Sequence, residues 1–228
     1  MPGVVQIALR GTSAFLLLDR RVTLIDTGLR GSARRLLQAV RLAGRRADEI
    51  EQVIITHYHP DHIGGLPELQ RILPAKAAIH AIDAPAVTGA GGPPSPFNAG
   101  WRRAAWRKLA PRLLPFEPVR IDELLHDGDE LPVLGGLRIV HTPGHTPGHV
   151  ALYLPELALL IAGDAMEYRR GRLTGPAAAV TADMPEALRS IDTLSRLAIE
   201  TIAFSHFPSI PAAAGERLRE LAARLPGE

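Results

Sequence analysis

Apolar residues recur along the chain at two different spacings, and segments of the two kinds alternate. Short apolar runs rich in β-branched residues predict strands at 4–9, 14–18, 22–25, 53–56, 131–134, 137–140, 150–154, 157–162 and 199–204. Apolar positions three or four residues apart predict helices at 33–43, 66–73, 185–197 and 213–225. Ser32 stands where it can cap the first of these helices, and Gly44 stands where that helix can end.

The predicted strands and helices fall into two similar halves, which indicates two sheets flanked by helices. With 228 residues the chain can form one well-cored domain, and 46% hydrophobic with 22% charged residues is ordinary for a globular protein. We therefore expect a single α/β domain across residues 1–228.

Charge and cysteine content exclude several classes of function. The sequence pI is about 9.4, but the formal net charge is only +2 and the arginines are scattered, so nucleic acid is not an expected partner. The absence of cysteine excludes disulfides, thiolate metal sites and a cysteine nucleophile. With no signal-peptide pattern and no apolar run of about 18 residues, we expect a cytoplasmic protein without membrane contact. The sequence leaves open whether the protein forms a homodimer.

Histidines and an aspartate crowd the end of one predicted strand, in the run 57–62 with sequence HYHPDH. Residues two apart in an extended segment point the same way, so His57 and His59 can meet one ion while Tyr58 turns away. Pro60 keeps His59 extended and suits the first position of a helix. Asp61 and His62 would then lie in a first helical turn, facing a second ion. Imidazole and carboxylate groups are ligands for zinc and similar divalent metals.

Further candidate ligands are spread over the second half of the chain. The run 141–149, HTPGHTPGH, has two Pro-Gly pairs that force turns, and its spacing does not say which of its three histidines binds metal. His141 and His149 are the two expected only to hydrogen-bond the turns. Asp164 and His206 each follow a predicted strand. Taken alone, Asp164 is as readily a turn residue as a ligand, and a lone histidine such as His206 is usually structural.

The order of these motifs resembles the metallo-β-lactamase superfamily from about Leu9 to Pro208, and its glyoxalase II-like and lactonase-like hydrolases in particular. The resemblance implies an αββα sandwich with two divalent ions at one edge. It assigns the first ion to His57, His59 and His145, the second to Asp61, His62 and His206, and a bridging role to Asp164. Asp26 matches the family's acid that orients ligand loops.

The resemblance also implies a reaction. Two ions, zinc by preference with iron or manganese as alternatives, would share a hydroxide that attacks the carbonyl of a small ester, lactone or thioester. Asp61 could carry a proton to the leaving group. The alternatives are a mononuclear iron enzyme of the persulfide dioxygenase type and a phosphodiesterase; a non-catalytic metal-binding protein is the third.

Substrate contacts are expected from three aromatic residues. Lactonases of the superfamily use a tyrosine three residues after the bridging aspartate, and Tyr168 follows Asp164 by four. The segment 84–118 interrupts the regular pattern with a glycine- and proline-rich loop and a predicted helix at 101–113 that carries Trp101 and Trp106. These tryptophans either cover the metal cleft as part of a lid or pack the insertion onto the core or a second subunit.

Overall fold

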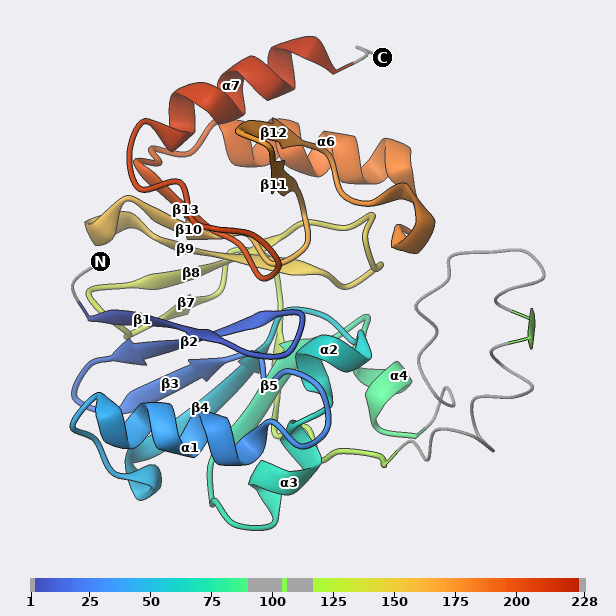
Figure 1. Cartoon of the computed structure of the whole chain (residues 1–228). Coiled ribbons are helices and arrows are strands. Elements are labelled where there is room, and N and C mark those ends of the chain that lie inside the picture. Colours follow the sequence, from blue (N-terminus) through green and yellow to red (C-terminus); the bar gives the residue numbers. More distant parts are fainter. Residues whose placement is uncertain (1–2, 90–103, 106–116, 226–228) are drawn as a thin grey trace. The chain divides into compact units, whose positions relative to one another are not determined.

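The computed structural model describes residues 3–89, 104–105 and 117–225 (Figure 1). The chain divides into two compact units, Met1–Leu125 and His126–Glu228. Most of the segment predicted as an insertion, including Trp101 and Trp106, lies outside the described residues, so its role stays a prediction, as does the single domain. No helix in the described ranges is long and apolar enough to cross a membrane.

The first unit contains a six-stranded sheet. Its strands, in spatial order, are β1 (Val4–Ala8), β2 (Ser13–Leu18), β3 (Val22–Ile25), β4 (Ile50–Ile55), β5 (Lys76–His80) and β6 (Glu123–Leu125). β1 to β3 form an antiparallel meander, and β3 to β6 pair in parallel. Parallel pairing brings the carboxyl ends of β3 and β4 to the same edge, where ligand sites of α/β sheets form.

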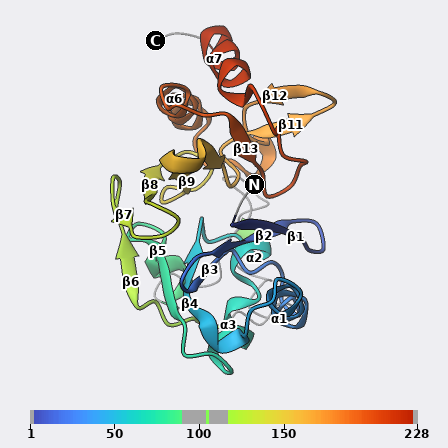
Figure 2. The same cartoon turned by 90° about the vertical axis from the view of Figure 1, so that its left-hand side faces the viewer.

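Helices cover one face of this sheet (Figures 1 and 2). They are α1 (Ala33–Leu42), the 3-10 turn η1 (Ala47–Glu49), α2 (Pro60–Ile63), α3 (Leu66–Gln70) and α4 (Ala84–Val87). α1 buries Leu36 and Val40 one turn apart, and they join a core cluster with Leu66 and Leu69 of α3. Ser32 occupies the N-cap position of α1 but makes no side-chain cap bond, because its backbone is already helical. The prediction that it caps the helix is wrong in this respect.

The second unit contains a five-stranded sheet and a separate hairpin. The sheet has the order β13 (Thr201–Ala203), β10 (Leu159–Ile161), β9 (Val150–Leu154), β8 (Leu137–His141) and β7 (Glu130–Leu131). The hairpin pairs β11 (Glu167–Arg169) with β12 (Arg172–Thr174), and the 3-10 turns are η2 (Pro155–Leu157) and η3 (Ala178–Val180). Helices α6 (Met184–Ser195) and α7 (Ala214–Arg224) share a core cluster with residues of this sheet, which they cover on one face (Figure 2).

Three predicted strands, at 131–134, 157–162 and 199–204, are shorter by two residues or more in the structure, and four strands were not predicted. β10 begins only at Leu159 because Ala158 adopts a left-handed φ of 44°, and β7 stops at Leu131 because Leu134 has a φ of 49°. The apolar pattern did not predict β5, β6, β11 and β12. The last two are short and polar; their one signal is Arg170-Gly171, where both residues have positive φ, as in the tight turns of hairpins.

Candidate metal centre

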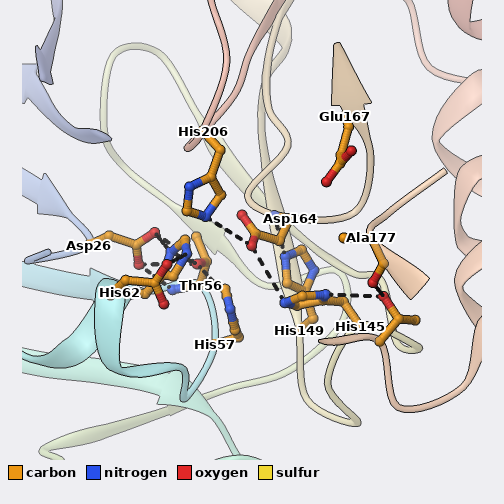
Figure 3. A network of polar contacts seen from close by, with 12 residues as sticks. Asp26, Thr56, His57, His62, His145, His149, Asp164, Glu167, Ala177 and His206 are labelled. Atoms are coloured by element: carbon orange, nitrogen blue, oxygen red, sulfur yellow. Dashed lines mark hydrogen bonds and ion pairs between the residues drawn. The ribbon is translucent and has the colours of Figure 1, made fainter. Parts of the chain in front are cut away.

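Asp26 and Thr56 directly follow the paired strands β3 and β4 and meet at the shared edge. The carboxylate of Asp26 is fully buried and accepts hydrogen bonds from the Thr56 amide at 2.8 Å and the Thr56 hydroxyl at 2.8 Å. It also lies 2.7 Å from Nδ1 of His62 (Figure 3). The backbone of Asp26 has a φ of 58°, so a rare conformation directs this carboxylate to its partners.

These bonds orient two of the candidate ligands. A carboxylate only accepts, so Nδ1 of His62 carries the hydrogen, and in the neutral ring Nε2 keeps its lone pair. The Thr56 hydroxyl donates to Asp26 and can therefore accept from Nδ1 of His57, 3.1 Å away. Both fully buried imidazoles are thereby held in the form that offers Nε2 to a metal ion.

The rest of the run 57–62 adopts the predicted local geometry. His59 is extended and Pro60 is the first residue of α2, while Tyr58 packs against the core cluster. The ligand atoms of His57 and His59 lie within 4.8 Å of each other, as do those of Asp61 and His62.

The loop after β3 anchors α2 through Thr27, which the sequence analysis did not single out. Its amide and hydroxyl both donate to the His62 carbonyl, at 2.6 and 2.9 Å. A side chain at Gly65 would place its Cβ 2.4 Å from the Thr27 carbonyl oxygen, so glycine allows the close approach.

In the second unit, Asp164 lies beside two histidines (Figure 3). Its Oδ2 is 3.5 Å from Nε2 of His145 and 3.2 Å from Nε2 of His206. Nδ1 of the buried His145 faces the Thr181 hydroxyl at 3.4 Å, and that hydroxyl donates to the Ala177 carbonyl at 2.9 Å. The Thr181 hydroxyl can therefore accept from Nδ1, which leaves Nε2 of His145 as the ligand atom.

The other two histidines of the 141–149 loop hydrogen-bond its turns, as predicted. Nε2 of His141 lies 2.9 Å from the Pro147 carbonyl oxygen. Nδ1 of His149 lies 2.7 Å from the Thr142 hydroxyl, and Nε2 of His149 accepts from the Asp164 amide at 2.9 Å. The last contact was not foreseen, because it joins residues fifteen positions apart in the sequence.

The start of α6 holds the loop in place. The carbonyls of Gly144 and His145 accept from the Asp183 and Ala182 amides at 2.9 and 3.1 Å. A Cβ at Gly144 would lie 2.2 Å from the Ala187 amide nitrogen, so only glycine allows this contact. The position of His145 therefore depends on α6.

Tyr168 belongs to β11, and its contacts are within the second unit. Its ring stacks on Phe204 with centroids 6.1 Å apart, and its hydroxyl oxygen accepts from Nη1 of Arg217 at 2.9 Å. The hydroxyl hydrogen can still be donated elsewhere. Substrate contact by Tyr168 stays a prediction.

The chemistry of these donors fits divalent metal ions. The first unit offers the imidazoles of His57, His59 and His62 with the carboxylate of Asp61, and the second offers His145, Asp164 and His206. Neutral imidazole nitrogens and carboxylate oxygens are the ligands of zinc, manganese and iron. Nδ1 contacts that leave Nε2 available are the usual arrangement around such ions.

Comparisons with known proteins agree with this chemistry. Residues 7–206 match the family model described as the metallo-beta-lactamase superfamily. The chain is 30% identical over 217 residues to the probable metallo-hydrolase YflN of Bacillus subtilis (strain 168), covering 89% of this chain and 81% of that protein. It is 32% identical over 152 residues to a hydroxyacylglutathione hydrolase of Rhodobacter capsulatus, covering 66% of this chain but 44% of that protein.

Among solved structures, the metallo-beta-lactamase family protein TTHA1429 from Thermus thermophilus aligns with a TM-score of 0.71 and 27% identity, covering 98% of this chain and 79% of that one. The predicted α/β fold of the metallo-β-lactamase type is thus confirmed. Family model, curated relatives and solved structure agree, and the chain belongs to the metallo-β-lactamase superfamily as one of its metallo-hydrolases.

Proposed function

We propose that the protein hydrolyses a small ester, lactone or thioester with two divalent metal ions, zinc by preference. In this proposal His57, His59 and His145 bind the first ion. Asp61, His62 and His206 bind the second, and Asp164 bridges the two.

The observation that carries the proposal is the environment of the Asp164 carboxylate. Its Oδ2 lies within 3.5 Å of Nε2 of both His145 and His206, which are assigned to different ions. A carboxylate that bridges two metals must lie beside ligands of each. The buried network around Asp26 supports the same proposal, because it prepares His57 and His62 for metal binding rather than for charge pairing.

Ions held by these residues would lower the pKa of a bound water towards ~7 and polarise the substrate carbonyl. The protein's own residues supply orientation and proton transfer. Asp61 is the most solvent-accessible of the proposed carboxylate ligands, with 34% of its side chain exposed against 15% for Asp164. It is therefore the group that can exchange a proton with the leaving group. Tyr168, whose hydroxyl can still donate, is proposed to contact the substrate.

The proposed substrate class follows from the relatives. Hydroxyacylglutathione hydrolase is named for a thioester substrate, but this chain spans less than half of that protein. We therefore carry over the acyl-transfer chemistry and not the glutathione moiety.

Metal analysis and a substrate panel test the proposal. We expect two ions per chain and turnover of an ester, lactone or thioester. His59→Ala and His145→Ala should each lower the turnover at least about 10³-fold, because loss of a ligand displaces the ion that activates the water. His141→Ala is the matched control from the same loop and should keep most activity.

Three results would contradict the proposal. A single iron with oxygen consumption would favour the dioxygenase alternative, and turnover of phosphodiesters alone would favour the phosphodiesterase. Full activity in His145→Ala together with loss in His141→Ala would mean that the wrong histidine was assigned.

A further inference from the structure

His149 is a fully buried histidine that the proposed metal site does not use as a ligand. It stands at the end of the 141–149 loop, directly before β9, and both of its ring nitrogens make hydrogen bonds. Nδ1 is 2.7 Å from the Thr142 hydroxyl, and Nε2 is 2.9 Å from the backbone amide of Asp164 (Figure 3).

The chemistry of the partners sets the direction of every bond. A backbone amide can only donate, so Nε2 of His149 must accept and carries no hydrogen. The neutral ring then bears its hydrogen on Nδ1 and donates it to Thr142. The Thr142 hydroxyl in turn lies 3.4 Å from the His149 carbonyl oxygen, to which it can donate. The lone pair of Nε2 is engaged, so His149 is not a metal ligand in this arrangement.

We infer that His149 is a positioning residue whose Nε2 holds the Asp164 peptide so that the Asp164 carboxylate points to His145 and His206. The inference rests on the proposed function, in which Asp164 is the bridging ligand.

The backbone around Asp164 needs such an anchor. Gly163 has a φ of 54°, so the chain turns sharply between the end of β10 and Asp164. Without Nε2 the part-buried Asp164 amide would lose this acceptor, and an amide withdrawn from water without a hydrogen-bond partner is disfavoured. The peptide would then rotate towards another acceptor and move the carboxylate with it.

Two substitutions separate the two bonds of the ring. The amide group of asparagine can replace Nδ1, which faces Thr142, but it does not reach Asp164. The longer glutamine can place its side-chain oxygen where Nε2 lies, and it keeps an acceptor for the Asp164 amide. His149→Asn and His149→Gln are therefore matched in polarity, and only His149→Gln keeps an acceptor for the Asp164 amide.

The experiment measures zinc affinity of the metal-free protein by competition with a chromophoric chelator, alongside the melting temperature of the metal-free protein. We expect His149→Asn to bind zinc at least about tenfold more weakly than the wild type, the usual effect of losing a residue that orients a ligand. His149→Gln should stay within about threefold. The two metal-free variants should melt at similar temperatures.

Equal zinc affinity of the two variants would overturn the inference, and so would losses that follow the melting temperatures alone. If His149→Asn does not fold, the pair Thr142→Val and Thr142→Ser gives the same test, since Thr142 holds the ring from its other side. Valine should weaken zinc binding several-fold and serine should restore it; equal affinities would overturn the inference. Asp164→Asn is measured in parallel. Unchanged zinc binding in that variant would refute the ligand role of Asp164, and hence the proposed function, whatever His149 does.

Discussion

Asp26 shows how a single buried carboxylate prepares neighbouring residues for metal binding. It accepts hydrogen bonds from Thr56 and from His62, residues 30 and 36 positions away. Its positive φ is one that aspartate and asparagine tolerate better than most side chains. The site therefore places at this position a side chain whose two oxygens both accept hydrogen bonds.

Asp26→Asn tests whether the site needs both acceptors, because asparagine keeps the backbone preference but places an N–H₂ group against donors. We expect zinc affinity to fall about 10- to 100-fold. The free energy of unfolding of the metal-free protein should fall by about 1–3 kcal/mol in urea titrations. Asp48→Asn, an exposed acid in the same unit, is the control and should change neither. Wild-type zinc affinity in Asp26→Asn would contradict the role of Asp26.

A second prediction at this scale concerns the hydroxyl of Tyr168. Tyr168→Phe keeps the stacking on Phe204 and removes only the hydroxyl. If that hydroxyl contacts substrate, kcat/KM should fall about 3- to 10-fold, the effect of one neutral hydrogen bond, with an unchanged melting temperature. Tyr153→Phe is the matched control, since the Tyr153 hydroxyl makes a part-buried hydrogen bond to the Ala198 carbonyl. Tyr153→Phe should lower the melting temperature and leave kcat/KM unchanged. A Tyr168→Phe variant with a lowered melting temperature and an unchanged kcat/KM would exclude Tyr168 from the substrate site.

At the scale of elements, the loop that carries His145 is held by α6. The contact is close because Gly144 has no side chain and has a φ of 125°. The Ser190 hydroxyl on α6 also donates to the Pro143 carbonyl at 2.7 Å. His145 stands on an irregular loop, and the contacts of that loop with α6 fix its position.

Gly144→Ala should disturb both stability and metal binding. Gly136→Ala is a matched control, because its φ of 129° is nearly the same but a Cβ there meets nothing within 4 Å. Both variants incur backbone strain of about 1–3 kcal/mol, and only Gly144→Ala adds overlap with α6, about 1–3 kcal/mol more. Urea unfolding and zinc titration check this. Equal destabilisation of the two, or unchanged zinc affinity in Gly144→Ala, would show that the loop does not depend on this contact.

At the scale of the whole molecule, the proposed ligands come from both compact units. His57 to His62 belong to the first, and His145, Asp164 and His206 to the second. Metal binding should therefore stabilise the entire chain. At 100 times its Kd an ion adds about 2.7 kcal/mol, which for a chain of this size corresponds to about 5–11 °C in melting temperature.

Removing metal with a chelator should lower the melting temperature by at least this amount, and zinc should restore it. Calorimetry of wild type and His145→Ala checks the coupling. The variant keeps all candidate ligands of the first unit, yet its response to zinc should be much smaller. An undiminished response would mean that the first unit binds zinc without the second.

The sequence by itself predicted most of the regular elements and the local backbone geometry of the run 57–62. β3 and β9 have the predicted bounds, and α1 begins and ends within a residue of its prediction, because apolar spacing depends only on neighbouring residues. The extended His59 and the helical start at Pro60 followed from the restrictions of a single proline. Where the backbone left its common conformations, as at Ala158, the same spacing predicted a strand too long.

Only the tertiary structure decided how the candidate ligands are oriented. The contact of Asp26 with Thr56 depends on the parallel pairing of β3 with β4, which no local pattern specifies. The same holds for the Asp164 amide on His149, because it requires β9 and β10 to lie side by side. Side-chain hydrogen bonds are short and directional, so they form only after the strands are paired, and residues far apart in the sequence become partners through that pairing.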